Sequence, residues 1–267
     1  MLCLVLIVFC CLAQVVELRR YIEVKNQNSF PIWIETLTNN NGAPLSNEIK
    51  RINPGGGIKY EISDHGWAGR VWPKIGCNRN GANCEFGQSI APCPSGGCHP
   101  PADTKVEFFF PRINSNQNSF YDISLVDGFS LASEIIPIRN GNHFQQGTCV
   151  RTDCRLTPNQ CPGNEKFGLG NLSVQKNNRP VGCLSPCKKW NYPAPYGQGR
   201  NEQQGDGRKL CCPSPVSVEE CRRGIVAQTE YVNLVRRACP TAYSFAYDDD
   251  GGSHDCPSDT SFHVTFR

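Results

Sequence analysis

Residues 120–129, FYDISLVDGF, are the stretch from which the fold can be inferred. They have the apolar content of a sheet strand and yet contain two carboxylates. Asp is disfavoured in strands. Side chains alternate between the two faces of a strand, so Asp122 and Asp127 point in opposite directions if the strand is straight. They can share a face only if the strand ends or bends between them, and the pair Asp127-Gly128 is a turn signal.

Alternating strands elsewhere in the chain predict an all-β protein. Residues 21–25 (YIEVK), 105–110 (KVEFFF) and 261–266 (SFHVTF) each place apolar side chains on one face and polar side chains on the other. Because strands of this kind lie at both ends of the chain, with turns rich in Gly, Pro and Asn between them, the pattern indicates a β-sandwich core.

Two segments depart from the strand pattern. Residues 229–237 predict a helix, since Thr229 can cap its start and Arg236 and Arg237 suit the negative end of its dipole. Residues 188–210 have almost no apolar side chains beyond aromatics and proline, and we expect a long surface loop there.

The segment MLCLVLIVFCCLA, residues 1–13, carries no charge and contains an apolar run over residues 2–12. This run is too short to span a bilayer as a helix. It has the length of a signal-peptide core, with Cys11 and Ala13 as small residues at a cleavage site. We therefore expect residues 1–13 to be a signal peptide and the protein to be secreted, without a stable membrane span.

The cysteine content agrees with an oxidising compartment. Three of the 17 cysteines lie in residues 1–13, which leaves an even 14. An even number after a signal peptide indicates a disulfide framework, here of seven bridges whose order the spacing does not determine. Zinc is the alternative, but no short C-x-x-C pair accompanies His at ligand spacing. We expect no metal and no cofactor.

Charge and length narrow the function classes. The net charge is +3 and the isoelectric point is near 8.1, which is too mild for a nucleic-acid-binding protein. The 267 residues suffice for one large all-β domain with smaller lobes, and we expect a monomer. Asn171 begins an Asn-Leu-Ser sequon and is a candidate glycosylation site.

Several blocks of sequence, in this order, resemble the thaumatin-like proteins, a family of plant pathogenesis-related proteins with relatives in insects and nematodes. The blocks are GRVWPKIGC (69–77), KVEF (105–108), FYDISLVDGF (120–129), the pair Cys211-Cys212, TEYVNLVRRACPTAYSFAYDD (229–249) and FHVTF (262–266). The match runs from about residue 21 to the C-terminus. The plant signature T-G-D-C is absent, since residues 84–93 read CEFGQSIAPC.

The resemblance implies a thaumatin-like β-sandwich core, a disulfide-rich lobe containing a short helix, and a small lobe of stapled loops. In this chain the core would take residues 14–74, 106–154 and 240–267. The small loop lobe would take residues 75–105, and the disulfide-rich lobe would take residues 155–239.

The resemblance also implies the disulfide pairing. The family's usual framework has one bridge more than this chain can form, because its first cysteine falls at Asn28 and the partner cysteine falls at Arg267. Both halves are missing together, so strand pairing must hold these two segments. By the family pattern the remaining bridges are Cys77–Cys84, Cys93–Cys98, Cys149–Cys256, Cys154–Cys239, Cys161–Cys183, Cys187–Cys211 and Cys212–Cys221.

In the antifungal members of the family, one arginine and four acids line an acidic cleft between the core and the long lobe. Matched position by position, these are Arg70, Glu107, Asp122, Asp127 and Asp249, with Asp248 as an adjacent alternative to Asp249. Four carboxylates held close together repel one another, and only Arg70 offsets their negative charge. We therefore expect the pKa of at least one of these carboxyl groups to be raised. Glycoside hydrolysis needs a protonated carboxyl beside an ionised one, and the family pattern implies Glu107 as the acid and Asp127 as the second carboxylate.

The resemblance implies a secreted antifungal defence protein that binds the β-1,3-glucan of fungal cell walls and hydrolyses it weakly. Trp67, Trp72 and Phe129 are either sugar-stacking surfaces or ordinary core residues. The alternatives are a protein that binds glucan without turnover or perturbs membranes, and a developmental or salivary protein that keeps only the fold. The alternative to a functional site at the five cleft positions is a network of ion pairs that only stabilises the fold.

Overall fold

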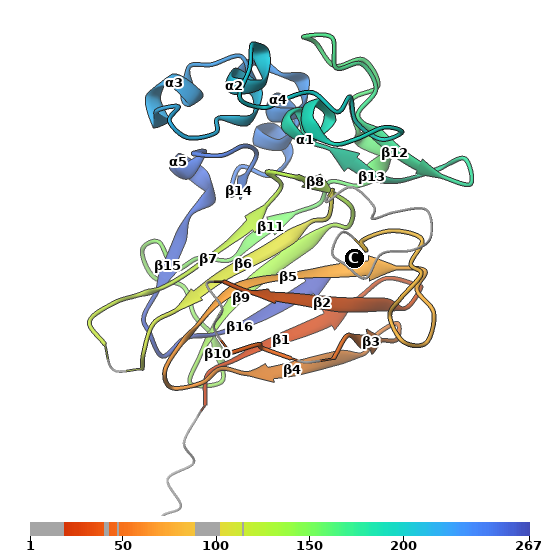
Figure 1. Cartoon of the computed structure of the whole chain (residues 1–267). Coiled ribbons are helices and arrows are strands. Elements are labelled where there is room, and N and C mark those ends of the chain that lie inside the picture. Colours follow the sequence, from red (N-terminus) through yellow and green to blue (C-terminus); the bar gives the residue numbers. More distant parts are fainter. Residues whose placement is uncertain (1–18, 40–42, 47, 89–101, 114) are drawn as a thin grey trace, which may run out of the picture.

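A computed structural model describes residues 19–39, 43–46, 48–88, 102–113 and 115–267. Figure 1 shows two layers of β-sheet with a lobe of short helices and a hairpin above them. The predicted signal peptide and the predicted Cys93–Cys98 bridge lie outside the described residues. Within these ranges, no helix has the length and apolar character needed to cross a membrane.

The first sheet of the sandwich has the strand order β10-β9-β16-β1-β4, with β11 also paired to β9. These strands are β1 (Tyr21–Asn26), β4 (Gly57–Glu61), β9 (Ser133–Arg139), β10 (Asn142–His143), β11 (Thr152–Cys154) and β16 (Ser261–Phe266). Strands β1 and β16 run parallel, with Ile22 beside Phe262 and Val24 beside Val264. All four side chains are fully buried. The pairing joins the segments that the missing bridge would have joined.

The second sheet has the order β14-β7-β6-β5-β2-β3, with β15 also paired to β7. Its strands are β2 (Ile32–Thr38), β3 (Lys50–Ile52), β5 (Trp67–Ile75), β6 (Lys105–Phe110), β7 (Ser119–Ser124), β14 (Ala242–Tyr243) and β15 (His254–Cys256). On β6, Val106, Phe108 and Phe110 are buried against the first sheet, where Phe262 packs on the two Phe rings. The alternate residues of β6 therefore face outward, as the sequence pattern predicts.

The lobe contains a small sheet and short helices. The sheet has the order β12-β13-β8, with β8 (Gly128–Phe129), β12 (Ser173–Lys176) and β13 (Arg179–Leu184). The helices are α1 (Pro186–Asn191), α2 (Asp206–Cys211), α3 (Val218–Arg222) and α4 (Glu230–Ala238), with 3-10 turns at Pro158–Gln160 and Val226–Gln228; helix α5 (Asp249–Gly252) follows β14. The predicted helix is confirmed as α4, and the Thr229 hydroxyl accepts the amide of Val232 at 3.2 Å.

The prediction of one long loop over residues 188–210 is wrong at both of its ends. Helix α1 begins after Ser185, whose hydroxyl accepts the amide of Lys188, and Pro186 stands at its first position. Trp190 is buried, and its indole nitrogen donates to the carbonyl of Asn201. The Cys187–Cys211 bridge joins α1 to α2. Buried aromatic area and this crosslink compensate for the low apolar content of the segment.

The disulfide pairing implied by the resemblance is confirmed for the bridges within the described residues. These are Cys77–Cys84, Cys149–Cys256, Cys154–Cys239, Cys161–Cys183, Cys187–Cys211 and Cys212–Cys221. Asn171 is exposed, as glycosylation requires, and its side-chain oxygen accepts the amide of Ser173 at 2.8 Å. Glycosylation itself and the lobe boundaries stay predictions.

Candidate functional site

The floor of the candidate site is the outer face of the second sheet. Glu107 on β6 lies directly opposite Arg70 on β5 and Asp122 on β7, so three of the predicted residues form one row across three strands. The guanidinium of Arg70 is 3.8 Å from the Glu107 carboxylate. The row follows from strand alternation, because each of these positions neighbours residues that are buried in the core.

The bend that brings Asp127 to the same site lies just beyond β7. This strand ends at Ser124, and the amide of Gly128 donates to the carbonyl of Leu125 at 3.1 Å to close the turn. Gly128 has a φ of 141°, and a Cβ there would lie 2.1 Å from the carbonyl of Cys183. Only glycine fits this close approach. Asp122 and Asp127 are thus separated by a real turn and do not lie on one straight strand.

Two lysines that sequence reasoning missed hold Asp127. Lys105, two residues before Glu107 on β6, is 3.0 Å from the Asp127 carboxylate, and its side chain is only 6% exposed. Lys188 on helix α1 of the lobe lies 3.2 Å from the other carboxylate oxygen. The expectation that only Arg70 offsets the acids is therefore wrong. The position of Lys105 could have been predicted from the sequence, because Lys105 lies on the same strand face as Glu107. The contact of Lys188 could not, because it depends on how the lobe docks on the sandwich.

The two carboxyl groups in the row resist ionisation. Burial raises the pKa of Glu107; Arg70 and Lys105 offset only part of this rise, and Asp127 adds to it. Burial and the adjacent Glu107 raise the pKa of Asp122 well above its ordinary value. The Oδ1 atom of Asp122 is buried and has no hydrogen-bond partner among the described residues. Asp122 is therefore neutral over a wider pH range than a free Asp.

Asp127 behaves in the opposite way. Burial alone would raise its pKa, but Lys105 and Lys188 together outweigh burial through their charges and hydrogen bonds, so the pKa of Asp127 lies below its ordinary value. The site thus combines carboxyl groups whose pKa values are raised, at Glu107 and Asp122, with one whose pKa is lowered, at Asp127. A pair of carboxyl groups with pKa values pushed apart in this way is the arrangement used for general acid catalysis beside a fixed negative charge.

The two candidates for the fifth acid have different surroundings. Asp248 is buried and accepts hydrogen bonds from Arg236 at 2.7 Å and from the hydroxyl of Ser244, so it connects helix α4 of the lobe to the segment that follows β14. Asp249 is half exposed, and it accepts the hydroxyl of Tyr243 at 2.7 Å. Because the backbone of Tyr243 pairs with Ser124 of β7, this residue connects Asp249 to the strand that carries Asp122. Asp249 stays the better candidate of the two.

The three aromatic residues considered as sugar-stacking surfaces are core residues. Trp67, Trp72 and Phe129 are 8%, 1% and 0% exposed. The indole of Trp72 also donates to the carbonyl of Gly87 at 3.1 Å. None of the three offers a free ring face, so their role is packing.

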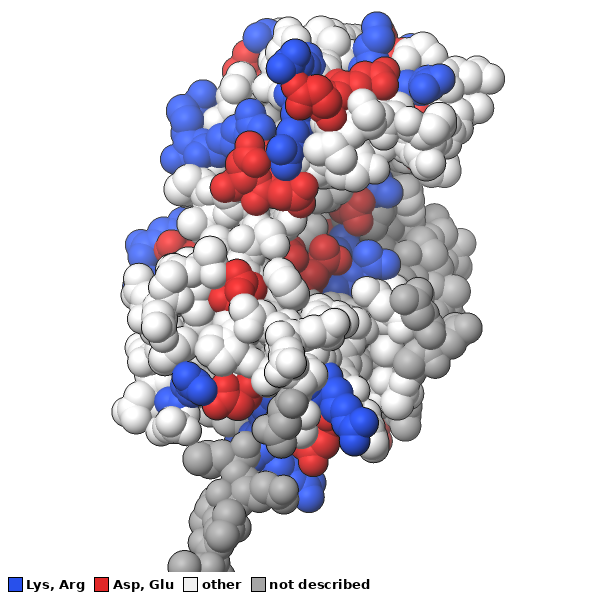
Figure 2. All heavy atoms as spheres, turned by 90° about the vertical axis from the view of Figure 1, so that its left-hand side faces the viewer, with Lys and Arg blue, Asp and Glu red and all other residues white. Residues whose placement is uncertain are grey.

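A cavity of about 190 Å³ adjoins Asp127 between the lobe and the sandwich, and Lys188, Glu202 and Ser244 also line it. Figure 2 shows acidic and basic side chains next to each other in the hollowed band below the lobe. Among the described residues, one group brings potential metal-ligand atoms together: Cys187, Glu202 and Cys211. Both cysteines are used in a disulfide, so the group lacks the thiolates that a zinc site needs.

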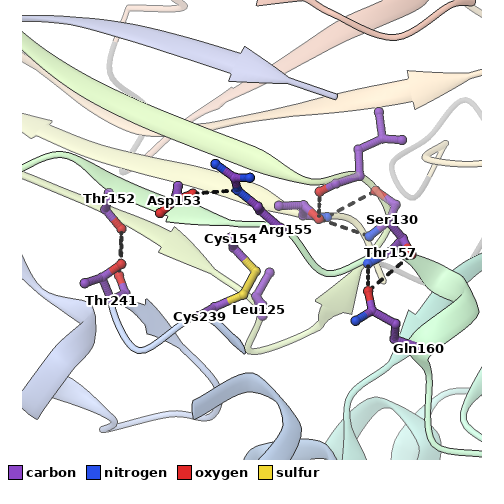
Figure 3. Close-up of a disulfide and its surroundings, with 12 residues drawn as sticks. Leu125, Ser130, Thr152, Asp153, Cys154, Arg155, Thr157, Gln160, Cys239 and Thr241 are labelled. Atoms are coloured by element: carbon purple, nitrogen blue, oxygen red, sulfur yellow. Dashed lines mark hydrogen bonds and ion pairs between the residues drawn. A yellow bond between two sulfur atoms is a disulfide. The ribbon is translucent and has the colours of Figure 1, made fainter. Parts of the chain in front are cut away.

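Covalent and polar contacts fix the lobe over the floor. The Cys154–Cys239 disulfide joins strand β11 of the sandwich to the end of helix α4, as Figure 3 shows. Beside it, the hydroxyls of Thr152 and Thr241 lie 2.7 Å apart. Lys188 and Asp127 form a second connection between the same two parts. The lobe is therefore tied to the sandwich at two places, one covalent and one ionic.

A β-sandwich with a disulfide-stapled lobe above a row of carboxylates defines a thaumatin-like fold. The chain belongs to the thaumatin family, whose family model matches residues 26–267. Thaumatin-like protein 1 of Arabidopsis thaliana is 28% identical to it, over 92% of this chain and 85% of that protein. A glucan endo-1,3-beta-glucosidase of Prunus avium is 30% identical, over 92% of this chain and 89% of that protein.

Among solved structures, the fold is similar to that of a laminaripentaose-producing β-1,3-glucanase in complex with laminaritetraose. The TM-score is 0.60 with 13% sequence identity, and the match covers 94% of this chain and 99% of that one. At this level of identity the likeness concerns the fold.

Proposed function

We propose that this protein is a secreted, monomeric defence protein that binds the β-1,3-glucan of fungal cell walls between its lobe and its sandwich and hydrolyses it slowly. The observation that carries the proposal is the pair of opposite pKa shifts on the floor, raised at Glu107 and lowered at Asp127. Membership of the thaumatin family and the name of the Prunus avium relative support glucan as the ligand.

In this proposal Glu107 is the general acid. It donates its proton to the glycosidic oxygen as the bond from that oxygen to the sugar carbon breaks. The ionised Asp127 either forms an ester with this carbon, which water then hydrolyses, or takes a proton from the water that attacks the carbon. Asp122 remains protonated beside Glu107 and limits the negative charge of the row. Hydrolysis should therefore decline as the pH rises through the raised pKa of Glu107, because the acid then loses its proton.

The second candidate function is glucan binding without turnover, and the two lysines favour it. A carboxylate that accepts contacts from Lys105 at 3.0 Å and Lys188 at 3.2 Å is a weakened base and nucleophile. If these contacts persist when sugar is bound, Asp127 cannot assist cleavage. The same residues would then form a polar surface for glucan hydroxyls.

A single assay separates the two candidates. The purified protein is incubated with a long soluble β-1,3-glucan, and new reducing ends are counted; binding to insoluble β-1,3-glucan is measured in parallel by pull-down. Under the catalytic proposal, Glu107→Gln and Asp127→Asn each lower the release of reducing ends, by roughly 100-fold or more for the general acid, and leave the pull-down largely intact.

Glu61→Gln is the matched control, since Glu61 is an exposed acid on β4 of the other sheet. It should change neither measurement. If the wild-type protein binds insoluble glucan but releases no new reducing ends from the soluble glucan, the result supports binding without turnover and excludes catalysis. Failure of the wild-type protein to bind either glucan would reject both candidates.

A further inference from the structure

Two exposed phenylalanines extend the floor of the candidate site away from the lobe. Phe109 on β6 and Phe120 on β7 are 40% and 46% exposed, although the neighbouring residues of both strands are buried. They lie directly opposite each other on adjacent strands, with ring centroids 6.3 Å apart and an angle of 51° between the rings. The rings form one shallow apolar surface.

The pair lies on the same sheet face as the carboxylates. Phe109 is two residues beyond Glu107, and Phe120 is two residues before Asp122, so each ring is displaced from the row by about 7 Å along its strand. Lys105 lies two residues from Glu107 in the other direction. One strip of sheet surface therefore runs from Lys105 through the carboxylates to the aromatic pair.

Small and polar groups border the pair. On one side of the pair, Ala68 on β5 lies opposite Phe109, and its small side chain leaves the Phe109 ring uncovered. On the other side, Asp255 on β15 lies opposite Phe120. The Asp255 carboxylate accepts hydrogen bonds from Thr148 and Asn118 and is therefore held in place. Exposed rings next to a fixed hydrogen-bond acceptor suit a ligand with apolar faces and hydroxyl edges, which describes a pyranose ring.

The pair contributes little to the core. Phe108 and Phe110, the neighbours of Phe109, pack inward on Phe262, and Tyr121 next to Phe120 does the same. The two adjacent rings keep apolar area in contact with water, and a ligand that covers them would remove this area from water.

We propose that Phe109 and Phe120 form a stacking platform for the sugar rings of a β-glucan chain that lies along β6 and β7 and passes over Glu107 and Asp122. This proposal rests on the proposed function, because it takes the ligand from it. It adds a binding subsite outside the five predicted positions, and it predicts that affinity rises with chain length until the chain reaches the platform.

The test measures binding of β-1,3-linked glucose oligomers of increasing length to the full-length protein by titration calorimetry. In the double variant Phe109→Ala with Phe120→Ala, we expect the affinity for the longest oligomers to fall roughly tenfold. A loss of this size corresponds to two lost contacts between a sugar and an aromatic ring. The shortest bound oligomer should bind as to the wild-type protein. Phe109→Tyr with Phe120→Tyr keeps both rings and should retain the wild-type length dependence.

Phe30→Ala is the matched control, since Phe30 is 38% exposed and lies between β1 and β2, away from the strip. Equal affinities for the double alanine variant and this control at every length would overturn the platform while leaving glucan binding intact. An equal loss at every length, or a change of the sedimentation coefficient that reveals a contact between copies, would also overturn it. If the wild-type protein binds no oligomer, the proposed function fails together with the platform.

Discussion

The sandwich and the lobe are stabilised in different ways. In the sandwich, long strands bury side chains such as Ile22, Val24 and Phe262 completely, and residues 14–76 contain no cysteine. In the lobe, helices α1, α2 and α3 have only five or six residues each. The bridges Cys161–Cys183, Cys187–Cys211 and Cys212–Cys221 all lie within it.

This difference follows from what each element can bury. Helices of five or six residues are far below the length that is stable alone in water, so crosslinks must reduce the entropy of the unfolded lobe. A strand pair in a sandwich obtains most of its stability from two packed faces, and the sandwich has one internal bridge, Cys149–Cys256. The candidate site lies where the two parts meet, with its floor on the sandwich and Lys188 on the lobe.

The largest expected effect is the loss of a core ring from the sandwich. Phe262→Ala removes a fully buried ring whose centroid lies 4.7–5.6 Å from the rings of Tyr121, Phe108 and Phe110. The cavity should lower the free energy of unfolding by roughly 3–5 kcal/mol in a urea titration. Val218→Ala, at an exposed lobe position, should cost far less; equal losses would contradict the burial account of the sandwich.

A smaller loss is expected when the covalent joint between the two parts is removed. Replacing Cys154 and Cys239 together by Ala should lower the free energy of unfolding by roughly 2–4 kcal/mol. Amide exchange should become faster in helix α4, whereas β1 and β16 keep their protection. The pair Cys77 and Cys84, separated by only 7 residues, is the control and should cost less when both become Ala. Uniformly faster exchange in both parts would show that they unfold as one unit.

The smallest effect concerns Asp122 on the floor. Its folded-state pKa lies above the unfolded value, so the stability it contributes is complete below the ordinary pKa of Asp and is lost as the pH rises through the raised pKa. Asp122→Asn removes this dependence and should stabilise the protein at neutral pH by an amount on the order of 1 kcal/mol. Melting temperatures of both proteins should converge in acid. A variant that is less stable than wild type at neutral pH would contradict the raised pKa.

Much of the floor could be predicted from the sequence because strand alternation is a local property. KVEFFF alone places Glu107 opposite to the core-facing Val106 and Phe108, and Asp127-Gly128 alone indicates the bend. The outward position of Phe109 follows from the same alternation. Its partnership with Phe120 does not, since it requires the register of β6 against β7.

The lobe was harder to predict because its order comes from distant contacts. Low apolar content favoured a loop over residues 188–210, although Ser185-Pro186 before them is a helix-start signal. The ion pair of Lys188 with Asp127 has no local signature, since it depends on the position of α1 over the sandwich. That one contact adds a positive charge to the site and helps to lower the pKa of Asp127.

The parallel pairing of β1 with β16 has a consequence for how the chain folds as it is made. The amide of Tyr21 donates to the hydroxyl of Ser261, 240 residues further along the chain. At a synthesis rate of about 5–20 residues per second, β1 waits roughly 10–50 s for this partner. Strand β4 can cover one edge of β1 early, but the other edge stays unpaired until β16 emerges. The nascent protein therefore exposes an open, apolar strand edge during most of its synthesis, when pairing with another chain is the principal hazard.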